Sequence, residues 1–271
     1  MLPVRILLLL SFILPTLTRA DEPPTVPESP DNFHLFLLIG QSNMAGRGVV
    51  EDVDKVANPH VLMLNKQGQW VPAVDPLHFD KPSIAGVGLG RTFGMDYAAA
   101  HPNVTVGLIP CAVGGSPIAS WEPAAFDDAT KTHPYDDAMI RAHVALKTGR
   151  LKGILWHQGE SDSKPELAAD YEAKLHALIQ RLRTELSPEL TGTKSIPFVA
   201  GQMGQFAERP WNDAKKQVDA VHKNLPSVVP ATAFANSDSL AHKGDEVHFD
   251  SASVRELGHR YYQAWKGIAG D

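Results

Sequence analysis

Apolar residues in this chain form short uninterrupted runs, and between these runs they recur every three or four positions. Short apolar runs without polar alternation are typical of parallel strands that helices cover on both faces. Five runs are therefore predicted to be strands: residues 33–39, 60–64, 104–113, 153–157 and 196–201.

The segments between these runs have the spacing of amphipathic helices. Five helices are predicted on this ground: residues 91–100, 138–148, 165–186, 211–224 and 251–268. Strands that alternate with helices predict an α/β protein, built as a three-layer α/β/α sandwich around a mainly parallel sheet. In such a sheet the active site lies beyond the carboxyl ends of the strands.

Residues 1–20 have the pattern of a secretory signal peptide. Arg5 precedes an apolar run over residues 6–14, and Thr18 and Ala20 are small residues before the expected cleavage site. The run is too short to cross a bilayer comfortably. We expect a secreted or periplasmic protein without stable membrane association after cleavage, and an uncleaved N-terminal anchor is the alternative.

Residues 21–31 are predicted to be an extended linker, because they contain four prolines and several acidic side chains. Residues 32–271 show no internal repeat and no second change of composition. They are predicted to form one domain.

Composition and charge narrow the range of functions. Apolar residues make up 43% of the chain and charged residues 21%, which are ordinary values for a globular protein. A net charge of −6 without a basic cluster argues against nucleic-acid binding. The single cysteine, Cys111, cannot form a disulfide within the chain, and its apolar neighbours predict a buried side chain rather than a nucleophile.

A serine follows the first predicted strand on a turn flanked by glycines, in residues 40–46 (GQSNMAG). The hydroxyl of Ser42 and the backbone N–H groups at this turn can face one cavity, which suits nucleophilic attack and oxyanion binding. Taken alone, this segment is also compatible with a serine that only caps the next helix.

Two further polar segments follow later strands. Gly114 and Gly115 follow the third strand, where glycines let the backbone approach a ligand closely. Residues 156–162 (WHQGESD) follow the fourth strand, and Gln158 offers an uncharged side-chain N–H that can stabilise developing negative charge. For His157, a structural role and a substrate contact both fit the sequence.

Asp245 and His248 lie three residues apart, just before the last predicted helix. At that spacing the carboxylate can accept the imidazole Nδ1–H, which leaves Nε2 to take a proton from a serine. These residues and Asp250 could instead ligate a cation. The chain has no HExxH motif and no cysteine cluster, however, so no metal is expected.

Together these segments resemble the sequence blocks of the SGNH hydrolases, specifically the branch of sialate O-acetylesterases and family six carbohydrate esterases that act on acetylated xylan. The matching segments are GQSNMAG (residues 40–46), GGSPIASW (114–121), WHQGESD (156–162) and DEVHF (245–249). Gln158 stands where many other SGNH enzymes have asparagine. The GxSxG pattern is absent, which disfavours an α/β-hydrolase with a nucleophile elbow.

The resemblance implies a flavodoxin-like SGNH hydrolase fold with about five parallel strands, and no cofactor. It implies a serine esterase that works through an acyl-enzyme, with Ser42 as nucleophile and His248 and Asp245 as its partners. It further implies an oxyanion hole formed by Ser42, Gly115 and Gln158.

An acetylated carbohydrate is the substrate that the resemblance implies, and the oligomeric state stays open. Five residues within the blocks are expected to contact it: Gln41, Asn43, Trp121, His157 and Glu160. For Trp121, stacking on a sugar and burial in the core are both open. Two other functions are the alternatives, namely a lipase or phospholipase of the same superfamily and a carbohydrate-binding relative that has lost catalysis.

Overall fold

A computed structural model describes residues 25–187 and 195–270 of the chain. The predicted signal peptide at residues 1–20 lies outside the described residues, as does the first part of the predicted linker. Within the described part of the chain, no helix has the length and apolar character needed to span a membrane.

A seven-stranded sheet forms the centre of the described structure, in the order β3-β2-β4-β1-β5-β6-β7. All neighbouring strands pair in parallel except β3, which is antiparallel to β2. The strands are β1 (Phe33–Gly40), β2 (Val61–Leu64), β3 (Trp70–Pro72), β4 (Thr105–Pro110), β5 (Arg150–His157), β6 (Phe198–Gly201) and β7 (Thr232–Ala235).

The mainly parallel α/β architecture confirms the predicted fold class, but the sheet has two strands beyond the expected five. Both additions, β3 and β7, lie at the edges of the sheet. Strand β3 has only three residues and ends in proline, and β7 has two alanines and a threonine among its four residues, so neither forms a run of large apolar side chains. The predicted third strand is also shorter in the structure, since β4 ends at Pro110.

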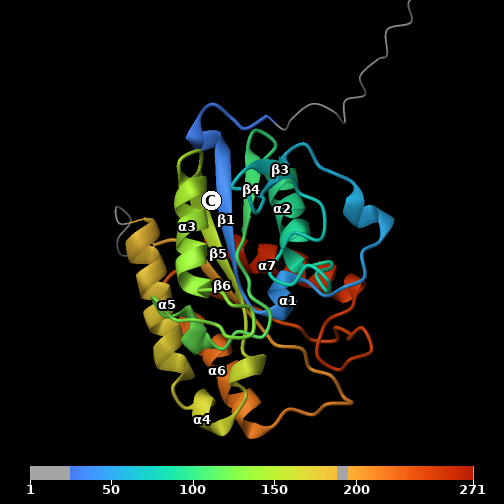
Figure 1. Ribbon diagram of the computed structural model, residues 1–271, viewed down its shortest axis with the longest axis vertical. Coiled ribbons are helices and arrows are strands. Elements are labelled where there is room, and N and C mark those ends of the chain that lie inside the picture. The colour runs from blue at the N-terminus through green and yellow to red at the C-terminus, as the bar shows by residue number, and fades with distance from the viewer. Residues whose placement is uncertain (1–24, 188–194, 271) are drawn as a thin grey trace, which may run out of the picture.

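Helices cover both faces of the sheet, as Figure 1 shows with α3 and α5 on one side of the strands and α2 and α7 on the other. The helices are α1 (Ser42–Ala45), α2 (Leu89–Ala100), α3 (Pro134–Leu146), α4 (Pro165–Ala168), α5 (Tyr171–Leu186), α6 (Asp213–Val228) and α7 (Ser251–Lys266). The helix predicted over residues 165–186 is therefore divided in two, with a break at Ala169 and Asp170.

The central strand β1 shows why its apolar run has no polar alternation. Leu35 and Leu37 pack into the core on the side of α3 and α5, while Phe36 and Leu38 pack into the core on the side of α2 and α7. All four side chains are fully buried. Burying each one stabilises the fold by roughly 1.5–3 kcal/mol, so both faces of this strand require apolar residues.

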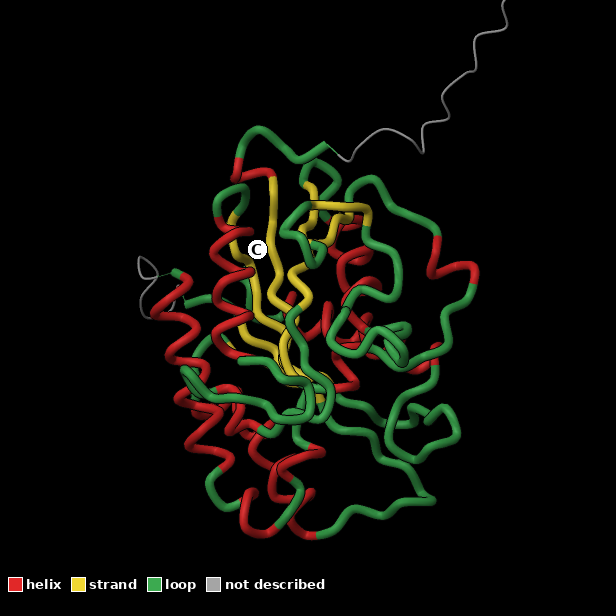
Figure 2. The backbone as a smooth tube through the Cα atoms, viewed as in Figure 1, coloured by secondary structure: helices red, strands yellow, loops and turns green. Residues whose placement is uncertain are grey.

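Strand β1 is the point where the strand order changes direction, because later strands are added first on one side of it and then on the other. From β1 the chain runs to β2 and β4 on one side, and then crosses to β5, β6 and β7 on the other. Ligands of open parallel sheets bind at such a switch point, outside the carboxyl ends of the strands. Figure 2 shows loops gathered at this lower end of the strands, where β1, β4 and β5 end.

Candidate active site

The turn after β1 places Ser42 at the switch point. Gly40 has a φ of +127°, a conformation that favours glycine. A Cβ atom at this position would lie 2.1 Å from the carbonyl oxygen of His157 on β5. Glycine therefore lets β1 and β5 stay paired up to their ends, and α1 begins two residues later with Ser42 at its first position.

His248 and Asp245 approach Ser42 from the loop before α7. The Nε2 atom of His248 lies 3.0 Å from the Oγ atom of Ser42, and its Nδ1 atom lies 2.7 Å from Oδ2 of Asp245. With Nδ1–H donating to the carboxylate, Nε2 accepts the hydrogen of the serine hydroxyl. The structure thus brings the three predicted residues into one hydrogen-bonded line.

Asp245 is held in its charged form. Partial burial raises the pKa of its carboxyl. Hydrogen bonds lower this pKa by more and bring it to about 2, and they come from the backbone N–H and imidazole of His248 and from the backbone N–H of Val247. Its Oδ1 atom accepts both backbone N–H groups, at 2.8 Å from His248 and 3.1 Å from Val247. The side chain is therefore an ionised acceptor near neutral pH.

Gly115 faces the same pocket as Ser42. Its φ of +84° favours glycine, and the nearest atom to a Cβ there would be the Nζ atom of Lys81, at 3.9 Å. Both backbone polar groups of the preceding residue, Gly114, are held. Asp80 accepts the N–H of Gly114 at 2.7 Å, and Lys81 donates to the carbonyl oxygen of Gly114 at 2.8 Å. Among the described groups, neither the N–H of Gly115 nor that of Ser42 has a hydrogen-bond acceptor.

Gln158 does not face this pocket, contrary to its predicted place in the oxyanion hole. The side chain is fully buried, and its Nε2 atom donates to the carbonyl of Ser116 and to Asp162. Its Oε1 atom accepts the hydroxyl hydrogen of Tyr171 at 2.8 Å. Both amide hydrogens are thus engaged beneath the loop that carries Gly115, so Gln158 fixes that loop instead.

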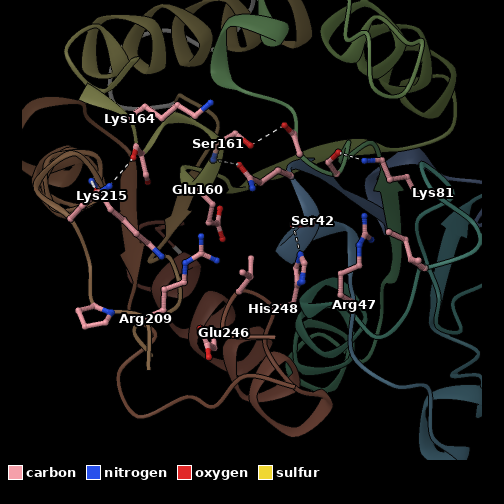
Figure 3. A pocket seen from close by; sticks show the side chains of 18 residues that line it. Ser42, Arg47, Lys81, Glu160, Ser161, Lys164, Arg209, Lys215, Glu246 and His248 are labelled. Atoms are coloured by element: carbon pink, nitrogen blue, oxygen red, sulfur yellow. Dashed lines mark hydrogen bonds between the residues drawn. The ribbon is translucent and has the colours of Figure 1, made fainter. Parts of the chain in front are cut away.

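Around Ser42 lies a pocket of about 530 Å³ in which basic side chains outnumber acidic ones. Figure 3 shows Arg209 and Lys215 on the side of Glu160, with Arg47 and Lys81 across the pocket. The charged residues that line it are Arg47, Lys81, Lys164, Arg209, Lys215, Glu160 and Glu246.

Comparison with known proteins shows the family to which this chain belongs. Residues 32–266 match the model of the family described as carbohydrate esterase, sialic acid-specific acetylesterase. The chain belongs to this family. It is 32% identical over 270 residues to a probable carbohydrate esterase of Arabidopsis thaliana, a match that covers 92% of this chain and 96% of the plant protein.

Solved structures of similar proteins have the same fold. An X-ray structure of an Arabidopsis thaliana protein superposes with a TM-score of 0.74 at 26% identity, over 88% of this chain and 99% of the other. A carbohydrate acetylesterase of Xanthomonas citri superposes with a TM-score of 0.64 at 22% identity, over 87% of this chain and 56% of that protein. The family match makes our chain a member of a carbohydrate acetylesterase family, a group of carboxylic ester hydrolases.

Of the five residues expected to contact the substrate, Gln41 and Glu160 line the pocket of this acetylesterase-family protein, while the other three do not. Trp121 is buried in the core, where it packs edge-on against Trp156 and donates its Nε1–H to Ser116. His157 is fully buried, and its Nδ1 atom lies 3.0 Å from the hydroxyl of Tyr261. Trp121 and His157 are therefore structural.

The sequence did not single out the basic residues of the pocket. Arg47 follows the first block directly, and Lys81 lies in the loop before α2. Arg209 and Lys215 follow the carboxyl end of β6. The position of Arg209 and Lys215 after β6 could have indicated that they border the site, because the carboxyl end of every parallel strand borders the same edge of the sheet.

Arg47 and Asp80 form a buried ion pair beside Gly114. Their side chains are 2% and 3% exposed, and the two charged groups lie 3.1 Å apart. Burial raises the pKa of the Asp80 carboxyl, but Arg47 and the N–H of Gly114 lower it by more, so the net shift is downward. On the opposite wall, burial lowers the pKa of the Lys215 ammonium.

Two other residues considered from the sequence also have defined places. Cys111 is buried, and burial raises the pKa of its thiol to about 11, so it is not a ready nucleophile. Asp250 caps α7 by accepting the N–H of Ser253 at 2.7 Å. In the part of the chain that the structure describes, no three His, Cys, Asp or Glu side chains form a group that could hold a metal ion.

Asn43, the third expected contact residue outside the pocket, ties the nucleophile turn to the histidine loop. Its Nδ2 atom donates to the carbonyl of Val247 at 3.1 Å, and its Oδ1 atom accepts the N–H of Phe249 at 3.3 Å. Both neighbours of His248 are thus held by one amide. The carboxylate of Glu160 accepts from the same Nδ2 atom at 2.7 Å and fixes the direction of that amide. Asn43 is a positioning residue.

We expect Asn43→Ala to lower kcat on 4-nitrophenyl acetate about 10²-fold, because a misplaced imidazole no longer meets the serine hydroxyl. A double-mutant cycle separates this from general damage. If Asn43 acts through His248, Asn43→Ala causes no further loss in a His248→Ala background. An equal loss in both backgrounds contradicts the positioning role.

Proposed function

We propose that the protein is a serine esterase that removes acetyl groups from carbohydrates through an acyl-enzyme. The line formed by Ser42, His248 and Asp245 carries the proposal. A serine hydroxyl is a weak nucleophile at neutral pH, and it needs a base within hydrogen-bond reach. His248 is such a base, and Asp245 orients it and stabilises its protonated form.

The proposed reaction has two steps. The Ser42 oxygen attacks the ester carbonyl carbon while His248 takes the hydroxyl proton, and the N–H groups of Ser42 and Gly115 stabilise the oxyanion. His248 then protonates the leaving sugar oxygen, which leaves an acetyl group on Ser42. Water repeats the attack with His248 as base, and acetate and the free serine are released.

The excess of basic side chains in the pocket favours, as substrates, acetylated sugars that carry a carboxylate. Arg209 and Lys164 have no ion pair among the described residues, and Lys215 is half-buried beside them. We expect Arg209→Ala to lower kcat/KM about ten-fold for an acetylated uronic acid and to leave an uncharged acetyl ester unaffected. The difference should shrink as salt is added. Equal effects on both substrates would contradict the assignment.

Acetate release from purified protein tests the proposed function. Acetylated xylan, acetylated pectin and acetylated sialic acid form the panel, with Ser42→Ala as the reference in each assay. Acetyl and octanoyl esters of 4-nitrophenol test the lipase alternative, which needs an apolar groove for the acyl chain. Mostly polar side chains line the pocket, which favours the acetyl ester. Sugar binding without turnover would instead support the non-catalytic alternative.

A further inference from the structure

A second hollow of about 670 Å³ lies beside the active-site pocket, between the loop after β6 and helix α6. Of its nine lining residues, five are apolar or aromatic and four are polar or charged. They are Phe206, Ala207, Pro210, Trp211 and Ala220, with Gln205, Lys216, Asp219 and Lys223.

The two hollows adjoin at the Arg209–Pro210 segment. Pro210 lines both of them. Lys215 lines the active-site pocket, and its Nζ atom lies 5.1 Å from the centre of the Trp211 ring, which lines the second hollow. A ligand that fills the active-site pocket can therefore continue across Pro210 to Trp211.

Trp211 is a preformed surface for a flat ligand. The ring is half-buried, and its Nε1–H donates to the carbonyl of Gly204 at 2.8 Å. This bond and the Lys215 contact fix the orientation of the ring, so little conformational freedom is lost when a ligand packs on it. Amphipathic rings beside polar side chains suit a sugar unit, which has both C–H faces and hydroxyl groups.

We infer that the second hollow binds the sugar unit next to the acetylated one in an oligosaccharide or polysaccharide chain. This inference rests on the proposed function, because the acetylated unit must occupy the pocket around Ser42. Pro210 carries the chain between the two sites, and Trp211 packs against the neighbouring unit. The second hollow thereby selects for substrates longer than one sugar.

Acetylated galacturonic acid and acetylated trigalacturonate are suitable probes, because the active-site pocket is rich in basic residues. The wild type should show a higher kcat/KM for the trimer than for the monomer. Trp211→Ala should lower kcat/KM for the trimer about ten-fold. It should leave the values for the monomer and for 4-nitrophenyl acetate unchanged.

A blocking variant tests the same site without removing any contact. Ala220 is exposed on α6 and lines the second hollow, so Ala220→Trp should fill it and lower only the trimer activity. Asn224→Trp is the matched control, since Asn224 is exposed on the same helix but lines neither hollow.

Three results would overturn the inference: equal wild-type kcat/KM for monomer and trimer, trimer activity unchanged by Ala220→Trp, or an equal loss with Asn224→Trp. Failure of the proposed function looks different. In that case Ser42→Ala would hydrolyse all three substrates as fast as the wild type.

Discussion

Replacing Ser42 by alanine is expected to lower kcat about 10⁶-fold on every acetyl ester, an effect that only the loss of His248 should match. The reason is that the attacking oxygen itself is removed, and no neighbouring group can replace it in line with His248. Hydrolysis of 4-nitrophenyl acetate, followed by absorbance, measures the loss. Residual turnover should exceed hydrolysis in water only through the remaining oxyanion donors.

Covalent labelling provides a second readout for the same prediction. A fluorophosphonate should add one phosphonyl group to the wild type, seen as a shift in intact mass, and none to Ser42→Ala. Ser227→Ala is the control, because Ser227 is exposed near the end of α6. Labelling of Ser42→Ala, or equal rates for the variant and the wild type, would show that another residue is the nucleophile.

Asp245→Asn is expected to lower kcat about 10⁴-fold. The amide keeps the shape of the side chain, but it can donate a hydrogen to Nδ1 and so favour the wrong imidazole tautomer. Nε2 then carries the hydrogen and cannot accept the proton of Ser42. The loss should appear in acetate release and, in proportion, in the rate of phosphonylation of Ser42.

Asp250→Asn is the matched control for that variant. Asp250 caps α7, and asparagine caps a helix about as well as aspartate, so this variant should fold and turn over like the wild type. If Asp245→Asn kept full activity, a different carboxylate would have to orient His248.

The pH dependence of Asp245 follows from the direction of its pKa shift. Because the pKa in the folded protein is lowered to about 2, the carboxylate stays ionised above its ordinary pKa of 3.8. The stabilisation that it provides is lost only as the pH falls from that range through about 2. Activity that declines between pH 7 and pH 5 therefore reports a group other than Asp245.

The sequence predicted the place of Ser42, His248 and Asp245 because each depends on local information. Strand β1 is apolar except at His34 and ends in glycine, and the position after such a strand borders the sheet edge whatever the rest of the chain does. The spacing of Asp245 and His248 likewise limits their separation. Strands β3 and β7 escaped prediction because neither WVP nor TAFA is a run of large apolar residues, and because pairing with neighbours rather than their own sequence makes them strands.

Side-chain direction is what the sequence could not supply. Trp156 and His157 are neighbours at the end of β5, so they point to opposite faces of the sheet, and both are buried. Gln158 comes next, but its direction depends on the backbone beyond the strand, where Gly159 has a φ of +142°. Polar residues at the carboxyl ends of the strands therefore identified the site. They did not show which of these side chains turn toward the ligand.

The serine and the histidine that face each other are 206 positions apart in the chain. The active site is complete only when the loop before α7 and α7 itself have docked beside the turn that carries Ser42. Recovery of ester hydrolysis after denaturation should therefore lag behind the recovery of helical signal. Hydrolysis would then report the last stage of assembly rather than the first collapse of the chain.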